Sequence, residues 1–102
     1  MFKPESFMLR GQVWKVEYVP DLKTDDGGTA LGFADCTTRV ISINTDQHPD
    51  SLYETLLHEV FHAYFYSTPI PGVNAKLEEA LCQHFATYVS DLLASNEFPP
   101  RR

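Results

Sequence analysis

Hydrophobic and polar residues largely alternate in the first half of the chain, with the period of two that a half-buried β-strand requires. Residues 12–19 are rich in β-branched and aromatic side chains and predict a first strand, which Pro20 ends. Residues 30–37 predict a second strand and residues 40–43 a third. Residues 1–11 are only weakly patterned and predict no element. Strands this close in sequence favour an antiparallel meander.

The hydrophobic pattern becomes helical after a polar loop at residues 46–50. Ser51 is followed three residues later by Glu54, a capping-box signature that predicts a helix over residues 52–66. A linker with two prolines and a glycine then interrupts the helical pattern. A second helix is expected over residues 75–94.

This order of elements predicts a single α+β domain over residues 1–102, with its core at about residues 12–94. A three-stranded, mainly antiparallel sheet should pack its apolar face on the two helices. The hydrophobic content of 43% and the aromatic content of 13% are typical of a compact folded chain. A domain this small can draw part of its stability from a metal ion.

The chain is acidic, with a formal net charge of −6 from 8 basic and 14 acidic residues. The basic residues are scattered and form no footprint for phosphates, so neither nucleic acid nor an anionic membrane surface is an expected partner. No apolar run could span a bilayer, and the N-terminus lacks the apolar region of a signal peptide. Two cysteines, Cys36 and Cys82, form no disulfide framework, which predicts a cytoplasmic protein with free thiols.

The most informative feature is the stretch His58-Glu59-Val60-Phe61-His62, which reads H-E-x-x-H inside the first predicted helix. Residues four apart share one face of a helix, so the two imidazoles can hold a single zinc ion. The glutamate beside the first histidine can then act as a general base on water. An ordinary polar stripe facing solvent would not explain this register in a chain with only four histidines.

A catalytic zinc site uses three protein ligands and leaves a fourth position for water, so the second predicted helix must supply one more. Glu78 and Glu79 are the candidates. Glu78 lies near the main apolar stripe of that helix, which favours an inward side chain. Glu79 shares its face with small residues, as expected where two helices approach closely, and we favour it as the ligand. The other glutamate could face solvent early in the helix, where it suits the helix dipole.

With both helices considered, the chain resembles zinc-dependent peptidases of the gluzincin type. The closest resemblance is to minimal gluzincins and to phage-associated peptidases of the ImmA/IrrE type. In that group the second helix often reads E-x-x-A-N-x-F-A. The stretch from Glu79 to Ala86 matches this pattern at both ends and at Phe85, while Cys82 and Gln83 replace the alanine and the asparagine. The match is a second reason to favour Glu79.

The resemblance covers roughly residues 12–93 and implies a zincin-like fold. It also implies a zinc metallopeptidase that hydrolyses peptide bonds in a peptide or protein substrate, with His58, His62 and Glu79 as metal ligands and Glu59 as the base. The sequence departs from the pattern of these peptidases in two ways. Only sixteen residues separate His62 from Glu79, which is a short interval, and no DNA-binding domain is expected. The biological role of larger relatives is therefore not carried over.

Peptidases of this type usually bind substrate as a strand added to a sheet edge, and residues 31–37 are the expected edge. A second donor often stabilises the oxyanion. None of the four candidate donors is singled out: Tyr64, Tyr66, His84 and Tyr88. His48 is expected to be structural and Cys82 a small buried thiol. Cys36 could bind the metal as an inhibitory ligand, an idea that only its residue type supports.

Two other interpretations remain open. The first is a non-catalytic, zinc-stabilised protein-binding module of the same fold, in which His84 or Cys82 closes the site as a fourth ligand. The second is a helix-hairpin interaction protein without a metal. An open, water-bearing position on the metal would favour the enzyme, and four protein ligands would favour the module. The metal-free alternative predicts that chelators leave the stability unchanged.

Overall fold

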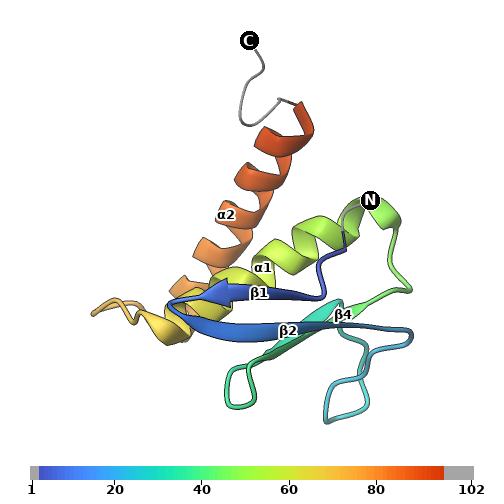
Figure 1. The fold of residues 1–102 in the computed structure, drawn as a ribbon, viewed down its shortest axis with the longest axis horizontal. Coiled ribbons are helices and arrows are strands. Elements are labelled where there is room, and N and C mark those ends of the chain that lie inside the picture. The colour runs from blue at the N-terminus through green and yellow to red at the C-terminus, as the bar shows by residue number, and fades with distance from the viewer. Residues whose placement is uncertain (1–2, 96–102) are drawn as a thin grey trace.

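The computed structural model describes residues 3–95, which form four strands followed by two helices (Figure 1). The protein is therefore of the α+β class, as predicted. The elements are β1 (Ser6–Leu9), β2 (Gln12–Val19), β3 (Gly32–Asp35), β4 (Val40–Asn44), α1 (Pro49–Ser67) and α2 (Ala75–Ser95). Within the described residues, neither helix is long and apolar enough to cross a membrane.

The strands form one mixed sheet in the order β1-β2-β4-β3. β1 pairs antiparallel with β2, β2 pairs parallel with β4, and β3 pairs antiparallel with β4. The predicted three-stranded meander is thus wrong, because β4 lies between β2 and β3. The parallel register sets Val16 beside Ile41 and Tyr18 beside Ile43, which concentrates the apolar side chains of the sheet on its two central strands.

The additional strand β1 lies in the stretch that predicted no element. It is only four residues long, so its alternation gives a weak signal. A tight turn folds it back onto β2, with Arg10 at φ 53° and Gly11 at φ 77°. Positive φ angles at both turn positions match the right-handed twist of the paired strands.

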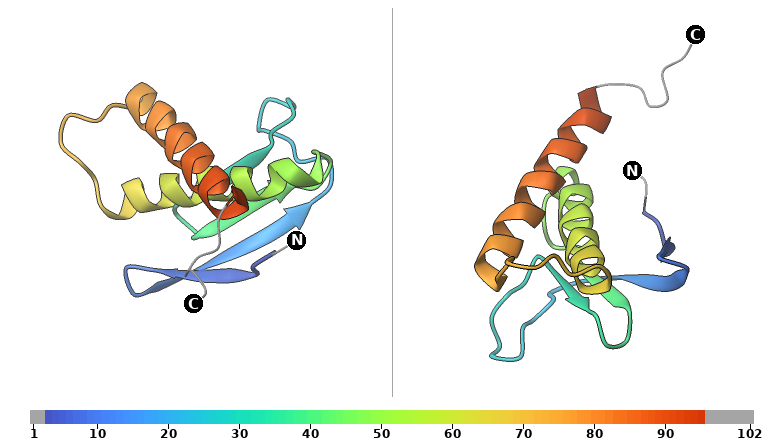
Figure 2. Two further views of the ribbon diagram at one scale, coloured as in Figure 1. Left: turned by 90° about the horizontal axis from the view of Figure 1, so that it is seen from above. Right: turned by 90° about the vertical axis from the view of Figure 1, so that its left-hand side faces the viewer.

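The hydrophobic core lies between one face of the sheet and α1. It joins residues of the two central strands to residues of α1: Trp14, Val16, Ile41, Ile43, Leu52, Leu56 and Ala63. Figure 2 shows α1 lying along the sheet, and α2 packs chiefly on α1 rather than on the strands. The predicted arrangement, with both helices on the sheet, therefore holds for α1 alone.

The face that α2 buries is its stripe of small residues, since Cys82 and Ala86 are fully buried. The larger apolar stripe, expected to point inward, is only partly covered, because Leu81 and Leu92 are half-buried while its other three residues are exposed. Leu77, Phe85 and Tyr88 are 44%, 41% and 64% exposed. Small side chains allow a close approach of the two helices, which matters for the position of Glu79.

Helix α1 begins earlier than predicted. His48 is the N-cap, and its Nδ1 accepts a hydrogen bond from the backbone N–H of Asp50 at 3.1 Å. Pro49 occupies the first turn, where its lack of an N–H costs nothing. Ser51 and Glu54 therefore lie inside the helix, and the predicted capping box is wrong. His48 is structural, as expected.

The edge strand β3 passes so close to α1 that a side chain does not fit at position 32. A Cβ atom built on Gly32 would lie 2.8 Å from Cγ2 of Thr55 and 3.0 Å from Cγ of Glu59. This contact brings the sheet edge against the helix face that carries the H-E-x-x-H motif.

We expect a Gly32→Ala substitution to lower the free energy of unfolding by about 1–3 kcal/mol, the usual cost of overpacking. Urea unfolding of the two proteins measures the difference. A second substitution, Thr55→Ser, removes the methyl group that the new carbon meets and keeps the hydroxyl that bonds Gln47 at 2.8 Å. The double variant should recover part of the loss, and a Gly32→Ala protein as stable as the original would contradict the expectation.

Candidate metal centre

Helix α1 presents the two histidines of the motif side by side. Their Nε2 atoms lie 3.2 Å apart, and the ring centroids are separated by 4.9 Å. The side chains of His58 and His62 are 13% and 20% exposed, so both are largely buried yet reachable from solvent. The spacing of four residues therefore places both Nε2 atoms at one point of the surface, as the helical period requires.

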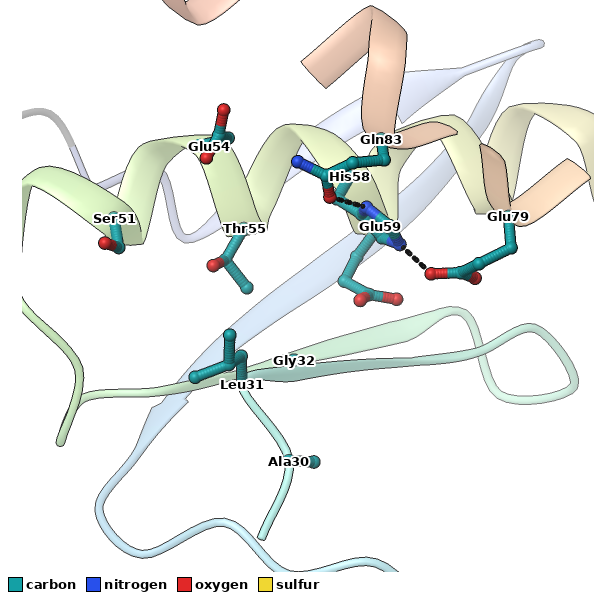
Figure 3. Close-up of a pocket in the computed structure, with 10 residues that line it drawn as sticks. All are labelled: Ala30, Leu31, Gly32, Ser51, Glu54, Thr55, His58, Glu59, Glu79 and Gln83. Carbon is teal, nitrogen blue, oxygen red and sulfur yellow. Dashed lines mark hydrogen bonds and ion pairs between the residues drawn. The ribbon is translucent and has the colours of Figure 1, made fainter. Parts of the chain in front are cut away.

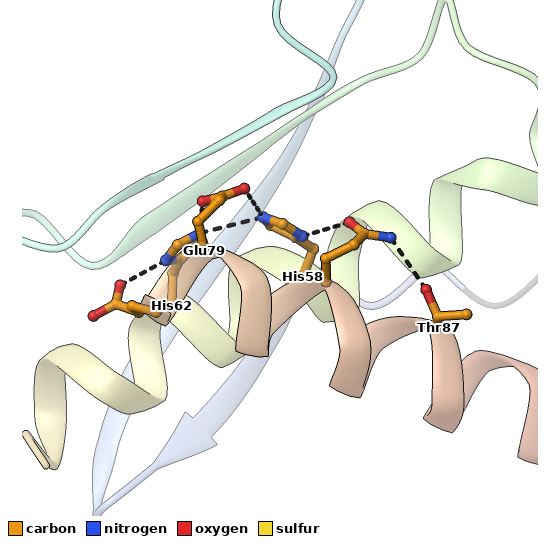
Figure 4. A network of polar contacts seen from close by, with 6 residues as sticks. His58, His62, Glu79 and Thr87 are labelled. Carbon is orange, nitrogen blue, oxygen red and sulfur yellow. Dashed lines mark hydrogen bonds and ion pairs between the residues drawn. The ribbon is translucent and has the colours of Figure 1, made fainter. Parts of the chain in front are cut away.

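Glu79 of α2 meets both rings at this point (Figure 4). Its Oε1 lies 2.8 Å from Nε2 of His58, and its Oε2 lies 2.7 Å from Nε2 of His62. Ligand atoms of the three residues lie within 4.8 Å of one another. The three residues predicted as metal ligands are thus brought together by the packing of α2 on α1.

The Nδ1 atom of each imidazole lies within hydrogen-bond distance of a side-chain oxygen of α2 (Figure 4). Nδ1 of His62 lies 2.7 Å from Oε2 of Glu78, and Nδ1 of His58 lies 2.9 Å from Oε1 of Gln83. The amide nitrogen of Gln83 in turn donates to the hydroxyl of Thr87 at 3.1 Å. Because a carboxylate and an amide oxygen only accept, they favour a proton on each Nδ1.

This arrangement leaves the lone pair of each Nε2 directed at the carboxylate of Glu79. Acceptors that converge in this way are satisfied by a cation between them. Two imidazole nitrogens and a carboxylate oxygen are a donor set that zinc takes in proteins, and other divalent ions bind such sets as well. The residues present therefore fit a zinc ion.

The two glutamates of α2 thus face opposite sides of one imidazole. Glu79 lies on the Nε2 side of His62 and Glu78 on the Nδ1 side. The idea that the second glutamate faces solvent is wrong, because Glu78 is partly buried against the ring. The contact of Gln83 with His58 was not predicted from the sequence, where Gln83 stands only as a replacement for asparagine. Its position one helical turn after Glu79 was the available signal.

Removing a group that hydrogen-bonds a metal-binding histidine usually weakens metal binding about 10- to 100-fold. We expect Gln83→Ala and Glu78→Ala each to lower the zinc affinity by about this factor. Each substitution frees one imidazole to turn or to change tautomer. Competition with a chromophoric zinc chelator measures the affinity. His84→Ala, at an exposed neighbouring position, is the matched control. Unchanged zinc affinity in both test variants would contradict a positioning role.

Burial lowers the pKa of His62, but the hydrogen bond to Glu78 and the charges of Glu59 and Glu79 outweigh this effect and leave the pKa raised. Protons therefore compete with a metal ion for this imidazole. Metal affinity should fall as the pH drops.

Glu59 is almost completely buried, at 9% exposure, next to the glycine of β3. Burial raises the pKa of its carboxyl group, the two histidines partly offset that effect, and the charge of Glu79 adds to it. Its oxygens form no hydrogen bond or ion pair within residues 3–95. The carboxylate is thus free to exchange a proton with a molecule in the site.

Two pockets meet at the site and share Gly32, His58, Glu59 and Glu79. The first, the Ser51 pocket, has a volume of about 430 Å³ (Figure 3). Its other walls are Ala30, Leu31, Ser51, Glu54, Thr55 and Gln83. The second, the Tyr66 pocket, has a volume of about 480 Å³. Its other walls are Phe33, Ala34, Cys36, His62, Tyr66 and Glu78. Together they form a groove along β3 with the candidate metal centre in the middle.

The four candidate oxyanion donors are not equivalent in the structure. Tyr66 lines the Tyr66 pocket. Tyr64 and Tyr88 are exposed and line neither pocket of the groove. His84 is exposed, lines neither pocket of the groove, and borders another hollow with Ala80, Gln83 and Thr87. Only Tyr66 is therefore brought to the candidate site.

The two cysteines lie near the centre but not among its three converging residues. Cys36 lines the Tyr66 pocket, yet it belongs to no cluster of metal-binding atoms in the described part of the chain. Cys82 is fully buried and forms a second cluster with His62 and Glu78. Burial raises the pKa of the Cys82 thiol to about 12, which agrees with a small buried thiol rather than a thiolate.

Comparison of the chain with protein-family models, with curated proteins and with solved structures finds no match. The chemistry of the site is therefore inferred from its own residues.

Proposed function

We propose that this protein is a zinc-dependent peptidase with a zincin-like fold, of the minimal gluzincin type that its motifs resemble. His58, His62 and Glu79 would hold the zinc ion, and Glu59 would be the general base. One observation carries the proposal. The Nε2 atoms of both histidines face the Glu79 carboxylate at 2.8 and 2.7 Å, beside a buried carboxyl group and at the centre of a groove.

A bound zinc ion would supply Lewis acidity towards a carbonyl oxygen and would lower the pKa of a water molecule to about 7. Glu59 would take a proton from the attacking water and pass it to the nitrogen of the departing amine. Its raised pKa suits both steps, because the carboxyl group must accept the proton and then release it. The reaction needs no covalent intermediate with the protein.

The position of β3 supports binding of an extended peptide. β3 ends the sheet, so the edge expected at residues 31–37 is an edge in the structure. The carbonyl of Leu31 accepts from the N–H of Asn44 at 2.8 Å. By the alternation of antiparallel pairs, the backbone groups of Gly32 and Ala34 then point to the open side. A peptide could pair with them as an added strand and lay a carbonyl group beside Glu59.

The arrangement supports an enzyme more than a closed, non-catalytic module. The module needs a fourth protein ligand, and His84 and Cys82 were its candidates. His84 lines neither pocket of the groove and joins no cluster of metal-binding atoms among the described residues, and Cys82 clusters with His62 and Glu78 rather than with Glu79. Neither candidate joins the set of three, which leaves room for water and substrate.

The proposal is tested by incubating the zinc-loaded protein with a peptide library prepared from whole-cell digests. Mass spectrometry of newly formed termini detects cleavage, and the chelator-treated protein is the control. We expect cleavage that depends on zinc. Full zinc occupancy without cleavage, together with X-ray absorption showing four protein ligands, would instead identify a binding module.

A further inference from the structure

Tyr66 lies one helical turn after His62 on α1, on the face that carries His58 and His62. Side chains of an α-helix lean towards its N-terminus, so the ring of Tyr66 leans over the turn that bears His62. In agreement, Tyr66 lines one pocket together with His62, Glu59 and Glu79.

The phenol of Tyr66 is not committed to another group of the protein. Its hydroxyl forms no hydrogen bond within the described residues, and its side chain is 61% exposed. The hydroxyl is therefore free to donate a hydrogen bond to a molecule bound in the pocket.

The rest of the Tyr66 pocket offers no equivalent donor. Its other polar side chains are the two imidazoles of the centre, carboxylates that accept hydrogen bonds when ionised, and the weak S–H donor of Cys36. Phe33 and Ala34 of the edge strand β3 line the same pocket. A peptide paired with that strand would therefore pass through the pocket that the phenol lines.

We propose that Tyr66 is a catalytic residue of this peptidase, whose hydroxyl donates a hydrogen bond to the oxyanion that develops on the scissile carbonyl. This inference rests on the proposed function. The phenol forms and breaks no covalent bond. It acts as a neutral donor that gains strength as negative charge appears on the carbonyl oxygen, so it stabilises the transition state more than the substrate.

The test compares Tyr66→Phe with the original protein and with two matched controls, Tyr64→Phe and Tyr88→Phe, which remove the same hydroxyl outside the groove. Loss of one oxyanion donor costs about 10²- to 10³-fold in kcat, and we expect this loss only in Tyr66→Phe. KM and the zinc content per chain should stay close to those of the original protein.

A binding measurement provides a readout independent of turnover. In the Glu59→Gln background, calorimetry compares a phosphinic peptide, which mimics the tetrahedral transition state, with the uncleaved peptide of the same sequence. Adding Tyr66→Phe should weaken the phosphinic peptide about 10²-fold and leave the uncleaved peptide unchanged.

The outcomes distinguish this inference from the proposed function. If Tyr66→Phe matches Tyr64→Phe in kcat and in phosphinic peptide affinity, Tyr66 is a wall of the groove and the peptidase proposal stands. A change in KM alone would likewise make Tyr66 a wall of the groove. If the zinc-loaded original protein neither cleaves peptides nor binds the phosphinic peptide, the proposed function fails and the role of Tyr66 fails with it.

Discussion

Replacing Glu59 with glutamine is expected to abolish most peptidase activity, by about 10²- to 10⁴-fold, while the protein still binds about one zinc ion per chain. Glutamine has nearly the same volume, so it can keep the packing against Gly32. It cannot accept a proton from water or return one to the leaving amine. Steady-state cleavage rates measure the loss of activity, and mass spectrometry measures the zinc bound per chain.

The control for this substitution is Glu17→Gln, an equal change at an exposed position on β2. It should leave both activity and zinc content unchanged. Activity of Glu59→Gln within about tenfold of the original protein would show that Glu59 is not the base. Loss of zinc in Glu59→Gln would show instead that the site had been disturbed.

The same substitution has a consequence for the metal-free protein. Burial raises the pKa of Glu59 above the unfolded value, so ionisation of this carboxyl group destabilises the fold as the pH rises through the folded pKa. Glutamine carries no such penalty. Metal-free Glu59→Gln should therefore be more stable than the metal-free original at neutral pH, and the difference should shrink below the ordinary glutamate pKa. Urea unfolding at both pH values measures it.

Zinc is expected to raise the melting temperature by about 15–30 °C when supplied at a thousand times its dissociation constant. Such an excess stabilises a folded protein by about 4 kcal/mol, and each kcal/mol shifts the melting temperature of a domain of this size by about 4–8 °C. The ion would join α1 to α2, which packs chiefly on α1. Differential scanning fluorimetry with and without a chelator measures the shift.

Substitutions assign the zinc effect to particular residues. His58→Ala and Glu79→Ala should lose the zinc-induced shift, and His84→Ala should keep it. If only His58→Ala loses it, the third ligand is Glu78 or another residue. If zinc does not move the melting temperature of the original protein, the chain is better explained as a helix-hairpin interaction protein without a metal.

Local patterns predicted the elements better than their arrangement. The bounds of β2 at residues 12–19 are confirmed, and both helices lie within a few residues of their predicted ranges. The strand order was missed because the pairing of β2 with β4 depends on burying Val16 beside Ile41, a contact across 25 positions that no local pattern reports. The start of α1 differs from the prediction because Pro49, which lies in the predicted loop at residues 46–50, is the first residue of the helix.

Local patterns also predicted that His58, His62 and Glu79 would converge at the candidate centre. The helical period places His58 beside His62, and the small residues around Glu79 indicated the face of α2 that meets α1. The roles of Glu78 and Gln83 could not be predicted, because they depend on which ring nitrogen each side chain reaches across the helix pair. The apolar stripe of α2 favoured an inward Glu78, and Glu78 is partly buried against His62, although Leu77, Phe85 and Tyr88 of that stripe are exposed.

The bare backbone at Gly32 has a consequence for selectivity. Main-chain pairing with β3 does not distinguish one amino acid from another. In the proposed peptidase, the substrate residues nearest the cleaved bond would be positioned by their backbone but not selected by their side chains. Discrimination would then arise further out, in the Ser51 pocket and the Tyr66 pocket on either side. Substrate preference could therefore change through substitutions at Ser51 or Phe33, without disturbing Glu59 or the metal ligands.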